Sequence, residues 1–339
     1  MSTTSLTPGT GSLQPTLEQV VTRPLLRKKR LVFTILISFL ILCTSLLLGF
    51  HAYIAWTLAR PHIDPLHSDP MKAVGLSYNN VTFPSLNGTS NLDGWFIPGN
   101  SDKTVIFSHG YGGNREELWV PIYSLARELH LQSYNVLMFD YGYVHPNSKR
   151  IMTGGIQESQ ELLGAIHYIK QISSGPIYIW GFSMGAGTAL QTALQSGNDI
   201  SGMILDSTFL LNPDTLYHNM KQVVNVPKFP SLPLVRLFFP LLNGVSLQEV
   251  PYNKVTSTAY PMPIFFIHGT EDYKAPYGMV EDMFKQQKDS ESKLWIIPNA
   301  QHELLYRAEP KTYMRRTMNF LNSISTTPMQ VNLGIPSSL

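Results

Sequence analysis

Apolar and polar positions divide this chain into three stretches of different character. Residues 1–30 are largely polar and end in a basic cluster at residues 27–30. The next twenty residues, 31–50, carry no charge at all. From about residue 75 onward, short apolar runs alternate with segments whose apolar residues recur every three or four positions. This pattern predicts a membrane-spanning helix followed by a folded domain of strands and helices.

The uncharged segment predicts a membrane anchor. Twenty helical residues at about 1.5 Å each span the roughly 30 Å hydrocarbon core, and Tyr53 and Trp56 follow where interfacial aromatic residues are expected. We therefore expect a transmembrane helix at residues 31–56. Basic residues before the span and almost none after it place residues 1–30 in the cytoplasm, as a disordered tail, and the domain outside the cell membrane.

Two alternatives to a single-pass anchor remain. A cleaved signal peptide would remove the apolar segment, but the run is long for one and the small-residue site at residues 57–59 is poor. Lipidation at Cys43 is weaker still, because Leu42 stands where a small residue is needed. We therefore favour the uncleaved anchor.

The domain expected at residues 75–325 alternates strands with helices. Continuous apolar runs are typical of strands that are buried on both faces. Strands are expected at residues 76–83, 94–97, 104–108, 134–139, 176–180, 202–205, 263–267 and 293–297, and helices at 116–130, 155–172, 278–287 and 310–322. The order predicts an α/β fold, a mostly parallel sheet covered by helices on both faces. Residues 57–74, rich in proline, are expected to be a linker and residues 326–339 a flexible tail.

Composition narrows the classes of function. The 339 residues are 43% hydrophobic, enough for one large domain with appendages. A net charge of +2, without a basic stripe in the domain, argues against nucleic acid as a partner. The single cysteine excludes an internal disulfide, and no histidine or cysteine cluster has the spacing of a metal site. No metal or organic cofactor is expected.

The candidate nucleophile is Ser183, in the G-x-S-x-G motif at residues 181–185. An apolar strand precedes the motif and a helix-compatible segment follows it. In such a strand-to-helix turn the glycines have no Cβ to clash, and the helix directs its positive N-terminal end at the serine. A motif of this length also occurs by chance as a plain glycine-rich turn, but its place between a strand and a helix favours the nucleophile.

Residues at other predicted strand ends can complete the chemistry. Active groups in parallel sheets gather at the carboxyl ends of the strands. A serine hydroxyl needs a base, which His302 can supply, and the base needs a carboxylate to orient it. Asp272 and Asp206 both follow strands and are the candidates for that carboxylate. The chain order Ser183, Asp272, His302 is the one that such sheets use.

These motifs resemble the α/β-hydrolase superfamily, in particular its serine-aminopeptidase-like branch of membrane-anchored or cytoplasmic bacterial hydrolases. The resemblance covers roughly residues 75–324 and depends on the motifs at residues 109–114, 181–185, 263–272 and 300–302. One departure is Gln301, where the family usually has glycine before its histidine. The departure concerns loop shape rather than the three reactive positions.

The resemblance implies a role for each residue of the site. Ser183 would be the nucleophile, His302 the base and Asp272 the acid that orients the base. The backbone N–H groups of Tyr111 and Met184 would form the oxyanion hole. Removing one such donor typically costs about 2.7–4 kcal/mol of transition-state stabilisation.

Other charged residues near the strand ends are expected to be structural. His109 and His268 each precede a glycine at a strand end and are expected to hydrogen-bond their loops. Asp140 is expected to cap a loop. Glu158 and Glu161 fall in a helix and are expected to be solvated or to interact with the helix N-terminus.

An insertion at about residues 209–257 occupies the position of a cap. Its strongly apolar part, residues 232–242, is interrupted by prolines. The simplest expectation is a set of helices packed over the sheet. The alternative is a short lid that forms an acyl pocket or rests on the bilayer, and either would favour an apolar acyl substrate.

Together these features predict a membrane-anchored serine hydrolase that cleaves carboxylic esters through an acyl-enzyme. The expected partners are a small-molecule acyl substrate and the membrane. A peptidase or amidase with the same residues is one alternative, and a catalytically idle scaffold used for binding is another. The motifs do not separate esters from amides, because specificity depends on loops and on the insertion.

Overall fold

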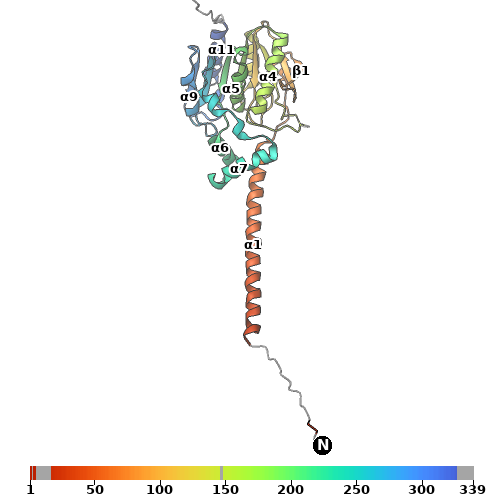
Figure 1. Ribbon diagram of the computed structural model, residues 1–339. Helices are drawn as coiled ribbons and strands as arrows, with labels where there is room; N and C mark the ends of the chain where they lie inside the picture. Colours follow the sequence, from red (N-terminus) through yellow and green to blue (C-terminus); the bar gives the residue numbers. More distant parts are fainter. Residues whose placement is uncertain (2, 5–16, 146–147, 327–339) are drawn as a thin grey trace, which may run out of the picture. The chain divides into compact units, whose positions relative to one another are not determined.

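The computed structural model describes residues 1, 3–4, 17–145 and 148–326 (Figure 1). The chain divides into two compact units, Met1–His51 and Ala52–Leu339. Helix α1 runs from Leu17 to Leu58, so residues 17–30 are helical where the sequence predicted a disordered tail. Leucine, arginine and lysine are good helix formers, and the basic cluster therefore continues the apolar helix.

The first unit contains the predicted span. Every side chain from residue 27 to residue 50 is exposed, as expected for a helix surrounded by lipid. Of the single helices in the described part of the chain, only the stretch Arg27–Leu58 is long and apolar enough to cross a membrane, and a signal sequence has the same composition.

The second unit is built on one eight-stranded sheet with the strand order β1-β2-β4-β3-β5-β6-β7-β8. Strands β3 to β8 are parallel, and β1 and β2 are added antiparallel at one edge. The bounds are β1 Asn79–Pro84, β2 Asn91–Ile97, β3 Thr104–Ser108, β4 Asn135–Phe139, β5 Ile177–Phe182, β6 Gly202–Asp206, β7 Ile264–Gly269 and β8 Lys293–Ile297. The predicted α/β architecture is confirmed.

Helices cover both faces of this sheet. Side chains of α4, α5 and α9 share one apolar core, and side chains of α3 and α11 share the other. The bounds are α2 Pro70–Val74, α3 Ile122–Leu131, α4 Ile156–Ile172, α5 Met184–Ser196, α9 Gly278–Gln286, α10 Leu305–Ala308 and α11 Pro310–Thr326. Along β5, Ile179 enters the first core and Trp180 the second, so the strand is buried on both sides.

Helix α3 begins later than the sequence predicted. The expected start was residue 116, but Pro121 occupies the N-cap and the helix begins at Ile122. Proline is tolerated at a helix start and not in its interior. Consequently Glu116 and Glu117 lie in the loop between β3 and α3, where both are buried.

The insertion folds as a helical cap. It contains α6 Pro213–Val223, α7 Lys228–Asn243, a short 3-10 turn at Leu247–Glu249 and α8 Tyr252–Ser257. Pro233 and Pro240 lie inside α7 without ending it. The expectation of packed helices is therefore met, although the prolines do not break the apolar segment into separate pieces.

Residues at the end of α1 belong to the core of this cap. Ile54, Ala55, Leu58 and Ala59 are buried with side chains of α6 and α7. The Asn243 side chain donates to the Ala55 carbonyl at 3.2 Å. The folded unit thus begins before residue 57, where a linker was predicted.

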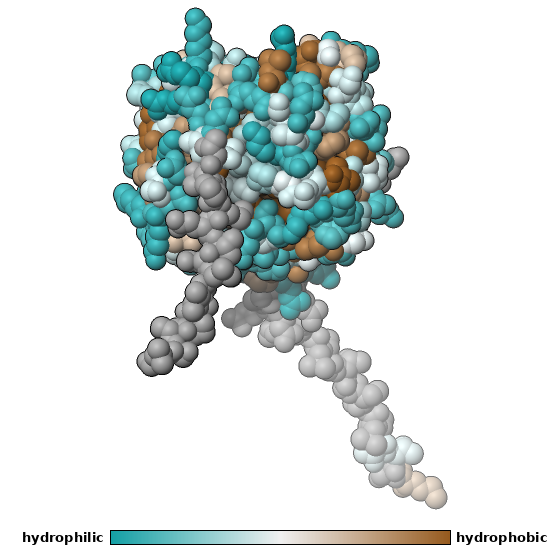
Figure 2. All heavy atoms as spheres, turned by 90° about the horizontal axis from the view of Figure 1, so that it is seen from above, coloured by the Kyte–Doolittle hydropathy of each residue, from teal (hydrophilic) through white to brown (hydrophobic). Residues whose placement is uncertain are grey.

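The rest of the surface is mixed. In the face that Figure 2 shows, hydrophilic side chains predominate and apolar ones are scattered among them. Such a surface is ordinary for a folded domain in water.

Candidate active site

Ser183 lies at the sharp turn between β5 and α5. Its φ of 51° and ψ of −116° are unfavourable for a residue with a side chain. The glycines on either side make the turn possible: a Cβ atom on Gly181 would be 2.6 Å from Ala186 Cα, and one on Gly185 would be 2.0 Å from Ser108 O. The turn therefore holds the serine in a strained position at the end of the strand.

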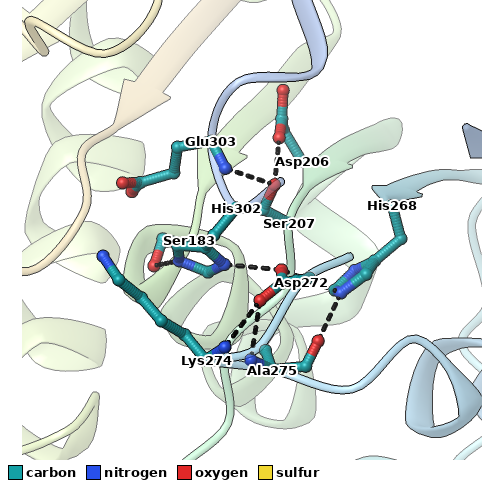
Figure 3. Close-up of polar contacts among 9 residues, drawn as sticks. All are labelled: Ser183, Asp206, Ser207, His268, Asp272, Lys274, Ala275, His302 and Glu303. Atoms are coloured by element: carbon teal, nitrogen blue, oxygen red, sulfur yellow. Dashed lines mark hydrogen bonds and ion pairs between the residues drawn. The ribbon is translucent and has the colours of Figure 1, made fainter. Parts of the chain in front are cut away.

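The structure brings the three predicted residues into one hydrogen-bonded line (Figure 3). Ser183 Oγ lies 2.7 Å from His302 Nε2, and His302 Nδ1 lies 2.6 Å from Asp272 Oδ2. Asp272 follows β7, and His302 lies in the loop between β8 and α10. With an ionised Asp272 as acceptor, the proton of the neutral imidazole is on Nδ1. Nε2 is then free to accept the serine proton.

Asp272 has more hydrogen-bond donors than His302 alone. Its Oδ1 accepts from the backbone N–H groups of Lys274 at 3.0 Å and Ala275 at 2.8 Å. Its Oδ2 also lies 3.0 Å from Nε2 of the buried His268. Burial by itself pushes the pKa of this carboxyl upward, but the hydrogen bonds from His268 and His302 outweigh burial and lower it.

His268 contacts the carboxylate as well as the loop. Its Nε2 lies 2.6 Å from the Ala275 carbonyl and 3.0 Å from Asp272 Oδ2, and both of these atoms are acceptors. The proton is therefore on Nε2, and the buried Nδ1 has no hydrogen-bond partner among the residues that the structure describes. The loop contact was expected from the sequence, whereas the contact with Asp272 was not.

Asp206, the other candidate for the acid, makes different contacts. Its Oδ2 accepts from the Tyr313 hydroxyl at 2.6 Å and its Oδ1 from the Ser207 hydroxyl at 2.8 Å. Burial raises the pKa of Asp206 to about 6, since these two hydrogen bonds offset only part of the effect. Among the described residues, the carboxylate hydrogen-bonded to His302 is that of Asp272.

The predicted oxyanion donors belong to two separate segments, a helix start and a loop. Met184 is the first residue of α5, and Tyr111 follows β3. Within the described part of the chain, neither backbone N–H donates a hydrogen bond. The loop before Tyr111 is fixed, because Glu117 Oε2 accepts from Gly110 N at 2.5 Å and the Tyr143 hydroxyl donates to Gly110 O at 3.3 Å.

His109 and Asp140 have the structural roles expected of them. His109 Nε2 accepts from Tyr141 N at 3.1 Å and its Nδ1 lies 3.0 Å from the Gly110 carbonyl, to which it donates. Burial lowers the pKa of His109, so the ring stays neutral. Asp140 accepts from the backbone and the guanidinium of Arg115 at 2.6, 2.9 and 2.7 Å.

Glu158 and Glu161 were expected to be solvated or to interact with the helix N-terminus; neither is solvated, and Glu158 interacts with the N-terminus of α4. Both are buried, because the first turns of α4 pack against neighbouring loops. Glu158 accepts from the backbone and hydroxyl of Thr153 and from Gly155 N, which caps the helix start. Glu161 accepts from the Gly142 backbone at 2.9 Å, and burial followed by the charge of Glu158 raises the pKa of Glu161 to about 7.

Two other acidic residues of the site, Glu117 and Glu303, were not predicted from the sequence. Both are buried close to Ser183 and both have a positive φ, of 36° and 58°. Neither belongs to a recognisable motif, and only the packing of distant loops buries them. Burial, and then the charge of Glu303, raises the pKa of Glu117 to about 8.

A large cavity lies on the other side of the loop that follows β3. Its lining includes Arg60, Asp93, Arg115, Asp140 and Tyr143, and it does not include the residues around Ser183. Charged side chains line this cavity together with apolar ones. The hydrogen-bond geometry at Ser183, rather than cavity size, makes that position the candidate reactive site. In the described ranges, no group of three or more histidine, cysteine or acidic side chains is arranged to hold a metal.

Comparison with known proteins agrees with this fold. A family model described as alpha/beta hydrolase fold matches residues 103–239. The uncharacterized protein YqkD of Bacillus subtilis (strain 168) is 25% identical over 242 residues, covering 69% of this chain and 76% of that protein. The monoglyceride lipase of Saccharomyces cerevisiae is 24% identical over 233 residues, covering 63% of this chain and 70% of the lipase.

Solved structures give the same result. The Pyrococcus furiosus esterase Pf2001 superposes with a TM-score of 0.65 at 25% sequence identity, covering 79% of this chain and 98% of the esterase. The fold is therefore the α/β-hydrolase fold. The esterase and lipase relatives support a hydrolase activity.

Proposed function

We propose that this chain, a member of the α/β-hydrolase superfamily, is a membrane-anchored serine hydrolase that cleaves carboxylic esters through an acyl-enzyme. The observation that carries the proposal is the hydrogen-bonded line from Ser183 through His302 to Asp272. The names of the relatives, an esterase and a monoglyceride lipase, favour an ester as the bond that is cleaved. The same three residues would also suit the cleavage of an amide bond.

In the first half of the reaction, Ser183 Oγ attacks the ester carbonyl carbon while its proton moves to His302 Nε2. The carbonyl oxygen becomes negative and accepts hydrogen bonds from the N–H groups of Tyr111 and Met184. Asp272 stabilises the imidazolium through Nδ1. The bond to the alcohol then breaks, and the departing oxygen takes the proton from Nε2. An acyl group is left on the serine.

Water completes the reaction in the second half. His302 Nε2 takes a proton from a water molecule as its oxygen attacks the acyl carbon, again with the oxyanion held by backbone N–H groups. The bond to Ser183 Oγ breaks, and the serine regains its proton from the imidazolium. The products are a carboxylic acid and the original enzyme.

The packing at the end of α1 supports an anchor that is not removed. Signal-peptide cleavage after Ala59 would remove Ile54, Ala55 and Leu58, which are buried in the core of the cap. Losing so much buried apolar surface is costly for a folded protein. The mature protein is therefore expected to retain residues 31–59 in a membrane fraction, which intact-mass measurement checks. A mature form that starts after residue 59 would contradict the anchor.

A fluorophosphonate probe tests the serine hydrolase directly. The wild-type protein should be labelled covalently and should hydrolyse a simple aryl ester. Ser183→Ala should lose both properties, with hydrolysis reduced by at least about 10³-fold. Ser207→Ala is a matched control, because Ser207 is a buried serine in the neighbouring loop that lies outside the line. Well-folded wild-type protein that resists the probe would refute the proposal.

A further inference from the structure

The carboxylate of Glu303, the residue directly after His302, lies beside the nucleophile. A Cβ atom on Gly110 would be 2.5 Å from Glu303 Oε1 and 3.4 Å from Ser183 Cβ, so the two side chains border the same small space. The Glu303 N–H donates to Ser207 Oγ at 2.9 Å. Together with the positive φ of 58°, this contact directs the side chain away from Ser207 and toward Ser183 (Figure 3).

The side chain of Glu303 is buried, and in the described ranges of the chain it forms no ion pair. Glu303 is 6% exposed, and among the described residues no hydrogen bond or ion pair reaches its carboxylate oxygens. Lys274 extends on the same side in Figure 3 and its charge lowers the pKa of Glu117, but it forms no ion pair within 4.0 Å in the described part of the chain. In the neighbouring Glu117, one buried carboxylate oxygen has no hydrogen-bond partner among the described residues. Unpaired buried charge is costly, so the cluster gains stability from a cation that a ligand brings.

The position of this charge also affects the reaction. In the proposed mechanism the substrate oxygen becomes negative next to the N–H of Tyr111, one residue after Gly110. A nearby carboxylate opposes that developing charge unless a cation lies between them. Burial, followed by the charge of Glu303, raises the pKa of Glu117 to about 8, so Glu117 adds little negative charge of its own at neutral pH. The Glu303 carboxylate therefore slows the reaction of a neutral substrate and speeds the reaction of a cationic one.

We propose that Glu303 is a specificity-determining residue that binds an ammonium group of the substrate close to the scissile carbonyl. The inference rests on the proposed function, because it places the substrate at Ser183. Two kinds of substrate carry such a group: an aminoacyl compound has it on the acyl side, and an amino-alcohol ester has it on the leaving-group side. In either case the ion pair forms in a water-poor site, where it is stronger than in bulk water.

Two pairs of substrates distinguish an ammonium group on the acyl side from one on the leaving-group side. The acyl side is tested with an alanyl ester and the 2-methylpropanoyl ester of the same alcohol, in which a methyl group replaces the ammonium group. The leaving-group side is tested with a choline ester and the matching 3,3-dimethylbutyl ester, in which carbon replaces nitrogen. The full-length protein should hydrolyse the charged member of one pair with a kcat/KM at least about tenfold higher. Equal rates within both pairs would overturn the proposal.

Glu303→Gln removes the charge and keeps the shape of the side chain. Its preference for the charged substrate should fall close to parity, and it should hydrolyse the neutral substrate at least as fast as wild type. A purely structural role predicts that both substrates slow together, which would overturn the proposal. Glu303→Asp keeps the charge and should retain part of the preference. Glu309→Gln, an exposed glutamate six residues further on, is the matched control and should retain all of it.

Fluorophosphonate labelling separates this inference from the proposed function. If the wild-type protein is labelled but does not prefer the charged substrates, the ammonium site is overturned and the proposed serine hydrolase activity is not affected. Folded wild type without labelling overturns the proposed function. A Glu303→Gln variant that is labelled as fast as wild type has an intact reactive serine. If that variant still preferred the charged substrate as strongly as wild type does, Glu303 would be excluded as the residue that binds the ammonium group.

Discussion

Asp206 and Asp272 occupy similar places in the fold and are held in opposite ways. Asp206 ends β6 and Asp272 closely follows the neighbouring strand β7, so both are buried carboxylates at the carboxyl edge of the sheet. Two imidazoles and two backbone N–H groups surround Asp272. Two hydroxyl groups surround Asp206.

This difference in donors decides how strongly each carboxylate is held in its ionised form as the pH falls. Burial pushes the pKa of both groups upward. In Asp272 the hydrogen bonds from His268 and His302 outweigh burial and lower the pKa, whereas in Asp206 the weaker hydroxyl donors leave the pKa raised to about 6. Only an ionised carboxylate stabilises an imidazolium. A position at a strand end is therefore not sufficient for a carboxylate to serve as the partner of His302. The hydrogen bonds around Asp272 favour it for this role.

The largest expected difference between the two aspartates appears in kcat when the charge of Asp272 is removed. Asp272→Asn should lower kcat for an aryl ester by about 10⁴-fold at neutral pH, because an amide favours the wrong tautomer of His302. Steady-state kinetics and the rate of fluorophosphonate labelling measure this effect. Asp206→Asn is the matched control and should stay within about tenfold of wild type. A comparable loss in both variants would show that the two carboxylates do not differ as we infer.

A second effect is expected in the pH dependence of stability. Folded Asp206 keeps its proton up to about pH 6, and an unfolded aspartate releases it near pH 3.9. Between about pH 4 and about pH 6 the folded state binds more protons, so Asp206 lowers the free energy of unfolding as pH rises, by on the order of 2 kcal/mol. Asp206→Asn should lack this contribution. Urea unfolding at several pH values measures it, and a constant difference between variant and wild type across that window would contradict it.

The smallest expected effect comes from His268, which supplies one of the donors that set Asp272 apart. His268→Leu should lower kcat/KM by about tenfold and move the acid limb of its pH profile to higher pH. The reason is that Asp272 then directs more of its charge to His302 and favours the protonated imidazole. His268→Gln can keep a donor at the position of Nε2 and should stay close to wild type. Identical pH profiles in wild type and His268→Leu would exclude this role.

Much of the fold was accessible from the sequence because the strands are buried on both faces. Continuous apolar runs located the central strands β3 to β7, which are buried throughout, and parallel strands bring their carboxyl ends to one edge. Ser183, Asp272 and His302 could therefore be placed together although they are far apart in the chain. That they lie within hydrogen-bond distance depends on the strained turn at Ser183 and the loop after β8, which a motif indicates without giving distances.

Other parts of the site follow from packing that a local pattern does not contain. Glu117 was expected inside a helix, and Pro121 moves the helix start so that Glu117 enters the loop under Gly110. Glu303 is buried because the loop after β8 folds back over the β3 loop at a positive φ. A glutamate at such positions has the same appearance in the sequence as a solvated one. Glu161, a buried residue of α4, likewise cannot be distinguished from a solvated glutamate in the sequence.

The hydrogen bond between Asn243 and Ala55 joins residues that are 188 positions apart in the chain. Synthesis runs from the N-terminus at about 5–20 residues per second, so α7 leaves the ribosome roughly 10–40 s after the residues that it covers. During this interval Ile54, Ala55 and Leu58 have no partner from the cap. The end of α1 is thus among the first parts of the folded unit to be made, and its own core is closed only when the cap helices arrive.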